Sequence, residues 1–224
     1  MDNRFLRNIP ALSESEQEML SHKRVLIVGC GGLGGYISEC LVRAGVGHIT
    51  AADGDVFEES NLNRQLLSTE AVLGLNKAET AKTRAEQINS LIDYAAYPEF
   101  FSAENAEKLL SGVDLVIDAL DSISARLLLE EECAARGLAL VHGAICGWSA
   151  QVCTVLPNSN ILHRLYANAD ESADKSCICS TPAFCAAIQS AEAVKLLCGK
   201  PAATENKLLI ADLRYMTFDI VEMV

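Results

Sequence analysis

The glycine-rich stretch VLIVGCGGLGG, residues 25–35, constrains the fold of this 224-residue chain more than any other feature. Its first four residues are typical of a buried strand, its glycines follow the spacing G-x-G-x-x-G at Gly29, Gly31 and Gly34, and a helical pattern comes next. The first glycine permits a tight turn, the second lets the backbone approach a phosphate, and the third lets the helix pack close to its strand. The pattern predicts a nucleotide phosphate at the N-terminus of that helix. It leaves open whether the nucleotide is a dinucleotide or ATP.

Strand and helix patterns alternate from this stretch to residue 143. Apolar runs predict further strands at 48–53, 94–98, 113–120 and 138–143. Helical periodicity and capping residues predict helices at 77–91, 102–110 and 122–136. Such alternation predicts an α/β fold with a doubly wound, mostly parallel sheet of Rossmann-like type.

The pattern changes after residue 143, where strands follow one another with little helix between them. Strands are expected at 151–156, 206–213 and 216–224, which predicts a C-terminal antiparallel extension of the sheet. One helix is expected at 183–198, with Thr181 as its N-cap, Pro182 at its first helical position and Gly199 after its end. The polar segment 158–180 is too long for an ordinary connection, and we expect a mobile functional loop there.

These patterns describe a single domain over residues 1–224. Its expected parts are an N-terminal helical segment at 1–24, a nucleotide-binding βα core at 25–143 and the antiparallel extension at 144–224. A formal net charge of −12 disfavours nucleic acid as a partner, because phosphate backbones require a basic surface. The sequence shows neither a bilayer-spanning run nor a signal peptide, so we expect a cytoplasmic protein with no membrane partner.

Polar residues after the second expected strand help to distinguish the two nucleotides. Asp53 ends that strand, where a carboxylate can accept hydrogen bonds from ribose hydroxyls. The loop beyond it places Asn61 and Arg64 in the run NLNRQ, and Lys77 opens the next helix. A guanidinium and an ammonium suit phosphate oxygens and supply the local positive charge that an acidic chain otherwise lacks. The set favours a triphosphate over a dinucleotide.

Five motifs in order, RFLRN, GCGGLG, DGDVFEESNLNRQ, GLNKAETA and DALDSISAR, resemble the ThiF/MoeB/HesA proteins, the bacterial relatives of ubiquitin-activating enzymes. The resemblance runs from Arg4 to about Leu156 and continues more loosely through the helix AIQSAEAVKLL. It implies an adenylation fold that binds ATP with Mg²⁺ and works as a homodimer. The implied reaction activates the C-terminal carboxylate of a small ubiquitin-like sulfur carrier, of ThiS or MoaD type and ending in Gly-Gly.

The resemblance also implies roles for individual residues. Asp53 would hold the ribose, Asp121 would bind Mg²⁺, and Arg7 would reach into the ATP site of the neighbouring subunit. The phosphate turn would be formed by Gly29, Gly31, Gly32 and Gly34, and the β- and γ-phosphates would be bound by Asn61, Arg64 and Lys77. Arg7, Arg64, Lys77 and Asp121 form the implied catalytic set.

The chain departs from many relatives in its cysteines. It has nine, none in a C-x-x-C pair, so we do not expect the structural zinc that such pairs hold in the family. The nearest substitutes for zinc ligands are Cys177, Cys179, Cys185 and His163. Without zinc, apolar packing alone is expected to hold the extension. Cys177 and Cys179 lie near the place where some relatives link covalently to the carrier, and we interpret them as incidental thiols while leaving that alternative open.

Other functions remain alternatives to carrier activation. One is a tRNA-modifying, cyclising enzyme of the same fold, which the acidic charge disfavours. A second is a non-catalytic nucleotide-binding scaffold, and a third is a dehydrogenase. Residues 141–148, VHGAICGW, follow the fifth strand, where they leave room for an extended tail or simply pack Trp148. The sequence identifies neither the carrier nor the pathway.

Overall fold

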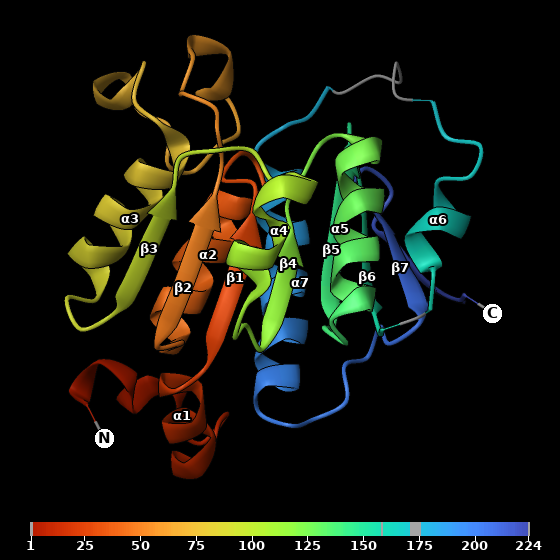
Figure 1. The fold of residues 1–224 in the computed structure, drawn as a ribbon. Coiled ribbons are helices and arrows are strands. Elements are labelled where there is room, and N and C mark those ends of the chain that lie inside the picture. The colour runs from red at the N-terminus through yellow and green to blue at the C-terminus, as the bar shows by residue number, and fades with distance from the viewer. Residues whose placement is uncertain (1, 158, 171–175, 224) are drawn as a thin grey trace.

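A computed structural model describes residues 2–157, 159–170 and 176–223. It contains an eight-stranded sheet in the order β3-β2-β1-β4-β5-β6-β7-β8 (Figure 1). The strands are β1 (Arg24–Val28), β2 (His48–Ala52), β3 (Asp93–Tyr97), β4 (Leu115–Asp118), β5 (Leu140–Cys146), β6 (Ser149–Val155), β7 (Lys207–Asp212) and β8 (Thr217–Glu222). Strands β1 to β5 are parallel and β6 to β8 are added antiparallel. The predicted fold class is confirmed.

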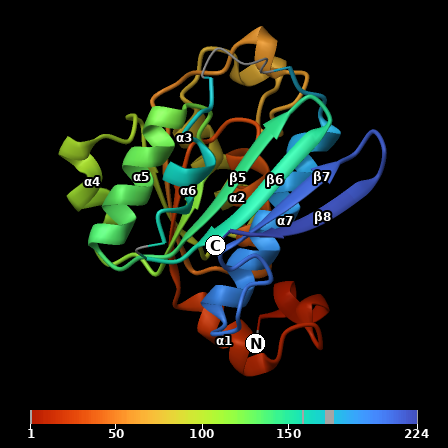
Figure 2. The same cartoon turned by 90° about the vertical axis from the view of Figure 1, so that its right-hand side faces the viewer.

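Helices cover both faces of the sheet. One face carries α2 (Gly34–Ala44), α3 (Lys77–Ile88) and α7 (Ser180–Leu197). The other carries α4 (Ala103–Leu110), α5 (Ile123–Ala135) and α6 (Ile161–Leu165). The short 3₁₀ helices η2 (Glu59–Asn61) and η3 (Glu70–Val72) lie in the connection between β2 and α3. The 3₁₀ helix η1 (Asn3–Asn8) and α1 (Glu14–Ser21) lie beyond the N-terminal ends of the strands (Figures 1 and 2).

Strand β1 lies at the centre of the sheet because its side chains are apolar on both faces. Val25 and Ile27 pack among the residues of α2 and α7, whereas Leu26 and Val28 pack on the side of α4 and α5. All four are buried, and each such side chain stabilises the fold by about 1.5–3 kcal/mol. A one-residue shift in register would exchange the two sets, so the pairing with β2 and β4 is strongly specified.

The connection between β6 and α7 differs in part from the prediction. Residues 161–165 form α6 in place of a loop, and residues 158 and 171–175 lie outside the described part of the chain. Helix α7 begins earlier than expected, with Cys179 at its N-cap position and Thr181 within its first turn. The predicted cap was wrong because the Thr181 hydroxyl donates to the Gly147 carbonyl oxygen, 2.9 Å away, in the β5–β6 turn.

Polar contacts help to hold the extension, so the expectation of apolar packing alone was wrong. The buried carboxylate of Glu130 on α5 accepts hydrogen bonds from the backbone N–H groups of Leu162 (2.9 Å) and His163 (3.0 Å). The Nδ1 atom of His163 lies 2.7 Å from the same carboxylate. Arg164 donates to the carbonyl oxygen of Met223 after β8, at 3.1 Å. These bonds fasten α6 to α5 and to the residue that follows β8.

Candidate active site

A cavity of about 630 Å³ opens at the carboxyl ends of the parallel strands, where α/β sheets bind ligands. Its volume suits a nucleotide-sized molecule. The predicted residues that line it are Gly29, Gly31, Gly32, Asp53, Arg64, Lys77 and Asp121. Gly34, Asn61 and Arg7, which are also described, do not line it.

Two glycines of the turn are required by close backbone approach. Gly29 has a φ of +98°, and a Cβ atom there would lie 2.5 Å from the carbonyl oxygen of Ala119. A Cβ atom at Gly34 would lie 1.8 Å from the carbonyl oxygen of Gly29, so the start of α2 packs directly on the turn. At Gly31, by contrast, the nearest atom would be 3.5 Å away. Gly31 therefore has no steric requirement within the protein, which agrees with a role in admitting a ligand.

Asp53 fixes the glycine turn from the end of β2. Its carboxylate accepts hydrogen bonds from the backbone N–H groups of Cys30 (2.6 Å) and Asp55 (2.8 Å). Burial raises the pKa of the Asp53 carboxyl, and these two hydrogen bonds together with the Lys77 ammonium oppose that rise. Each carboxylate oxygen retains lone-pair capacity. Asp53 can therefore organise the turn and still accept hydrogen bonds from ribose hydroxyls.

The two predicted phosphate cations differ in their present partners. The Arg64 guanidinium is held by the carbonyl oxygen of Ser60 (2.9 Å) and the amide oxygen of Asn63 (2.8 Å). Lys77 is the first residue of α3, and its Nζ atom lies 3.0 Å from the Asp55 carboxylate. The Lys77 side chain is only 9% exposed, so its charge acts in a partly desolvated setting.

Asn61 and Gln65 of the NLNRQ run have different surroundings in the structure. Asn61 is buried, and its amide oxygen accepts a hydrogen bond from the backbone N–H of Glu58 at 3.2 Å, so it shapes the loop. Gln65 lines the cavity beside Gly31, and its buried Oε1 atom has no hydrogen-bond partner. A buried polar atom without a partner is costly. Gln65 is therefore suited to a ligand that donates a hydrogen bond at this place.

Asp121 lies on the turn between β4 and α5, and it shares the cavity wall with Asp55 and Asp170. Ser122 caps α5 by accepting a hydrogen bond from the backbone N–H of Ala125. Carboxylate oxygens are the ligands that Mg²⁺ prefers, together with phosphate oxygens of a nucleotide. The described carboxylates do not form a metal site by themselves, so a magnesium ion at Asp121 would need phosphate oxygens of a bound nucleotide as further ligands.

A buried polar network lies beside the Asp121 turn. The Nδ1 atom of His142 on β5 lies 2.6 Å from the Asp118 carboxylate, and its Nε2 atom lies 3.0 Å from the Tyr166 hydroxyl. Burial lowers the pKa of the His142 imidazole and raises the pKa of Tyr166 to about 12. Arg126 and Gln151 donate to the same hydroxyl, at 3.0 and 2.8 Å.

Sequence reasoning missed this network, although Arg126, Gln151 and Tyr166 all line the cavity. Arg126 closes the motif DALDSISAR, which could have marked it, since a guanidinium inside a nucleotide motif is a candidate ligand. Tyr166 lies in the expected loop and His142 inside an apolar strand, so neither had a local signal. Only the three-dimensional packing brings them together.

Three thiols lie at or near the rim of the cavity. Cys146 and Cys177 line it, and the Cys179 sulfur lies 3.0 Å from the Tyr36 hydroxyl. Burial raises the pKa of the Cys177 thiol, and the nearby Arg64 guanidinium opposes that rise. A raised pKa lowers the fraction of reactive thiolate at neutral pH. The interpretation of Cys177 as an incidental thiol stays a prediction.

The four substitute zinc ligands are not brought together. Cys185 is buried on α7, where its thiol lies near the backbone oxygens of Ala144 and Gln151. His163 is paired with Glu130 on the opposite face of the sheet. Within 2–157, 159–170 and 176–223, no group of three or more His, Cys, Asp or Glu residues is placed to hold a metal ion.

Arg7 lies far from the cavity of its own chain. Arg7 is exposed and belongs to η1. The N-terminal segment lies beyond the N-terminal ends of the parallel strands (Figure 1). Residues that line the cavity follow the carboxyl ends of those strands. Phe5, a neighbour of Arg7 in η1, packs beside Gly45 at the end of α2, which fixes η1 at that place. Any action of Arg7 on ATP therefore requires a second chain.

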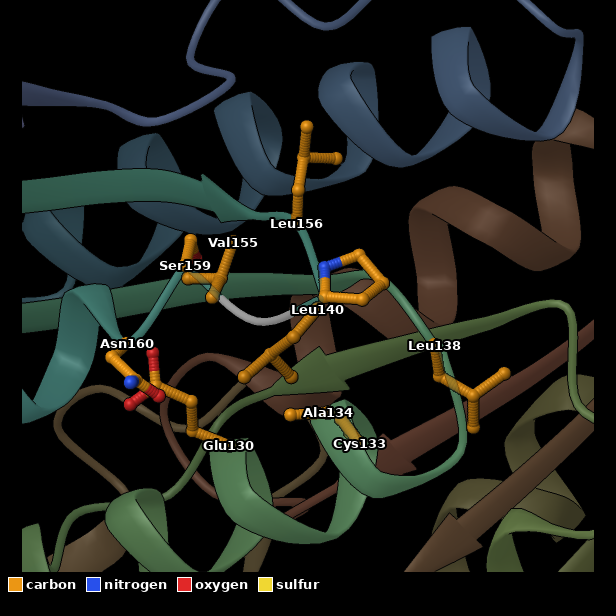
Figure 3. Close-up of a pocket in the computed structure, with 10 residues that line it drawn as sticks. Glu130, Cys133, Ala134, Leu138, Leu140, Val155, Leu156, Ser159 and Asn160 are labelled. Carbon is orange, nitrogen blue, oxygen red and sulfur yellow. The ribbon is translucent and has the colours of Figure 1, made fainter.

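A second, much smaller hollow lies between α5 and the strands β5 and β6 (Figure 3). Its volume of about 10 Å³ admits no more than a single water molecule. Its wall is mainly apolar, with the Glu130 carboxylate near one end beside Asn160. It has no room for a substrate.

The chain was compared with known protein families. The family profile described as the ThiF family matches residues 4–224. The chain belongs to the ThiF family.

Named relatives are adenylyltransferases or activating enzymes. The SAMP-activating enzyme E1 of Haloferax volcanii is 33% identical over 214 residues, which are 93% of this chain and 79% of that protein. The sulfur carrier protein adenylyltransferase of Thermus thermophilus is 39% identical over 144 residues, 64% of this chain and 53% of that protein. The adenylyltransferase and sulfurtransferase MOCS3 of Culex quinquefasciatus is 32% identical over 93% of this chain. The chain spans about half the length of that MOCS3 protein, 50%.

Solved structures share the fold at low sequence identity. The structure of E. coli MccB with ATP has a TM-score of 0.83 at 22% identity and covers 100% of this chain and 72% of that one. PaaA has a TM-score of 0.80 at 22% identity and covers 94% of this chain and 76% of that one. Among the described residues, no helix has the length and apolar character needed to cross a membrane.

Proposed function

We propose that this protein is an ATP-dependent adenylyltransferase acting on a small ubiquitin-like sulfur carrier of ThiS or MoaD type. It would convert the C-terminal glycine carboxylate of the carrier to an acyl-adenylate and release pyrophosphate. One observation carries the proposal: a single cavity joins the glycine turn, Asp53, the cations Arg64 and Lys77, and Asp121. The names of the relatives, which include a sulfur carrier protein adenylyltransferase, support it.

The chemistry of the step needs few protein groups. A carboxylate oxygen of the carrier attacks the α-phosphorus of ATP, an oxygen–phosphorus bond forms, and the bond to the pyrophosphate oxygen breaks in line. The attacking carboxylate is already ionised at neutral pH, so no general base is required. Catalysis therefore consists of holding the reactants in line and stabilising negative charge.

Arg64 and Lys77 are the groups proposed to stabilise that charge. Both would contact the β- and γ-phosphates, where negative charge increases as pyrophosphate leaves. Lys77 forms an ion pair with Asp55, 3.0 Å away, and a bound phosphate would compete with that carboxylate for the ammonium group. Asp121 would hold Mg²⁺, which supplies further neutralisation of the phosphate oxygens.

Proposed assembly and setting follow from the same site. We propose a homodimer in which the partner's Arg7 completes the cation set, because the N-terminal segment that carries Arg7 lies beyond the far end of the sheet in its own chain. We also propose a cytoplasmic setting, since the reaction consumes ATP and all nine cysteines are free thiols.

The test is exchange of labelled pyrophosphate into ATP, with a purified sulfur carrier from the same genome that ends in Gly-Gly. Exchange is expected with this carrier and not with the same carrier lacking its last glycine. Calorimetry with ATP alone serves as the binding control. Binding without carrier-dependent exchange would indicate a scaffold, and NAD binding that ATP cannot displace would indicate a dehydrogenase.

A further inference from the structure

The hydrogen-bond count around Tyr166 assigns a direction to every bond in the buried network. Arg126 and Gln151 have only N–H groups facing the Tyr166 hydroxyl, so its oxygen accepts both of those bonds. The phenol proton is then donated to Nε2 of His142, 3.0 Å away. His142 is left with its proton on Nδ1, which it donates to the Asp118 carboxylate at 2.6 Å. The Tyr166 hydroxyl thus accepts two hydrogen bonds and donates one, which fills its hydrogen-bonding capacity.

The other end of this network holds the turn that carries Asp121. The backbone N–H of Leu120 donates to the Asp118 carboxylate at 2.9 Å. The carbonyl oxygen of Leu120 accepts a bond from Arg126 at 2.6 Å. Asp118 and Arg126 thus form hydrogen bonds with both backbone groups of Leu120, the residue before Asp121. Arg126 is bonded directly to Tyr166, and Asp118 is connected to Tyr166 through His142.

Tyr166 itself belongs to a different part of the chain. It follows α6 directly, and its backbone N–H donates to Leu162 at 2.9 Å. The start of α6 is fastened to α5 by Glu130. Tyr166 therefore ties the far end of α6 to residues of the cavity wall, by the hydrogen bonds of its hydroxyl and by ring contacts with His142 and Arg126.

We propose that Tyr166 is a positioning residue that couples the docking of residues 159–170 to the placement of the Asp121 turn, an inference that rests on the proposed ATP site. The Tyr166 ring also packs edge-on against the His142 ring and lies under the Arg126 guanidinium, so the hydroxyl supplies the hydrogen-bonded part of the coupling. Arg126 holds the Leu120 carbonyl oxygen directly, and His142 acts on the Leu120 N–H through Asp118. Since coupling between two sites is reciprocal, a nucleotide bound at the turn also stabilises the docked position of α6.

The test compares Tyr166→Phe with the intact chain by amide hydrogen exchange, followed by mass spectrometry on peptides covering 115–122 and 159–170. The variant keeps the ring and removes only the hydroxyl. Without nucleotide, both peptides are expected to exchange about tenfold faster, as loss of one buried bond to a charged group implies. With Mg·ATP and no carrier, exchange in 159–170 is expected to slow in the intact chain and to be unaffected in the variant.

Tyr94→Phe is the matched control. Tyr94 is also buried, and its hydroxyl is hydrogen-bonded to Ser38 at 2.9 Å, but it does not line the cavity. The proposal is overturned if Tyr166→Phe leaves the 115–122 peptide unchanged, or if Tyr94→Phe accelerates both peptides equally. Failure of the ATP site would show differently, as absence of ATP binding to the intact chain, and the nucleotide-free comparison would still decide the coupling.

Discussion

The central parallel strands β1 and β4 are buried between helices on both faces, whereas the outermost strand of the antiparallel extension, β8, is exposed (Figure 2). All six residues of β8 are exposed. The ring of Phe218 on this strand contacts the ring of Phe184 on α7. The central strand β1, by comparison, buries its last four residues. The first region combines extensive apolar burial with a buried polar network at Asp118 and His142. The second relies more on individual polar bonds from Glu130 and Arg164.

The two regions also contribute differently to the cavity between them. The glycine turn, Asp53, Arg64 and Lys77 come from the parallel half, and Gln151 and Tyr166 come from the extension. Substitutions of Arg64 and Lys77 are expected to abolish chemistry without unfolding the protein, whereas the close backbone approach at Gly29 makes a larger residue there destabilising as well. Substitutions of Gln151 and Tyr166 are expected to change stability and the placement of α6.

The largest effect is expected for Lys77→Ala and Arg64→Ala. Each should reduce carrier-dependent pyrophosphate exchange by about 2–4 kcal/mol of transition-state stabilisation, because each removes a charged contact to the leaving group. Thermal unfolding should change little, since the Lys77 ion pair uses a carboxylate that is 56% exposed. Lys82→Ala on the same helix is the control, since Lys82 pairs with Glu86 at the surface. Full exchange in both variants would contradict the assigned roles.

A smaller effect is expected when two inactive variants are mixed. The experiment tests whether the active site is complete within one chain or needs Arg7 from a second chain. Arg7→Ala and Asp121→Ala protomers are each expected to be nearly inactive. A mixed dimer should regain one intact site, and up to about half of the activity of the intact dimer, if Arg7 acts across the interface. Heterodimer formation is verified by two different affinity tags. If mixing restores nothing in verified heterodimers, Arg7 does not act in the partner's site.

The smallest effect concerns the polar bonds of the extension. The hydrogen bond to Glu130 raises the pKa of His163 above its ordinary value of 6.5. A raised folded-state pKa means that protonated His163 stabilises the fold; this contribution is complete below pH 6.5 and is lost as the pH rises through the raised value. His163→Gln should therefore lower Tm most near pH 6 and least near pH 9. The side chain is 38% exposed, so the difference should stay below about 1 kcal/mol.

His22→Gln provides the matched control for that measurement. His22 also pairs with a glutamate, Glu18, but both side chains are 74% exposed. A pH-dependent change in Tm of equal size in His22→Gln would show that the effect does not arise at the extension.

The sequence was sufficient to predict every strand of the sheet, because apolar runs and the alternation with helices are local signals. It failed at α6, whose five residues are stabilised by a carboxylate on α5 that lies far away in the sequence. The start of α7 was missed for a similar reason, since Thr181 finds an acceptor in another turn. Elements held by local patterns are predictable, and elements held by distant polar partners are not.

The candidate site divides in the same way. Gly29, Asp53 and Lys77 could be placed from motif and strand position, and the structure brings them to one cavity. The predicted phosphate contact of Asn61 stays a prediction, since its side chain shapes the loop behind the cavity wall. Tyr166 and His142 carry no motif, and only packing between α6 and β5 joins them.

The position of β1 between β2 and β4 has a consequence during protein synthesis. The strands β1, β2 and β3 leave the ribosome before β4, so one edge of β1 stays unpaired until β4 has been synthesised. The glycine turn also lacks the backbone of Ala119, which Gly29 approaches closely in the finished sheet. In a nascent chain that ends before β4, the proposed nucleotide site is therefore not yet formed. ATP in the cell can stabilise only chains that have been synthesised beyond that strand, because a ligand stabilises only the state that binds it.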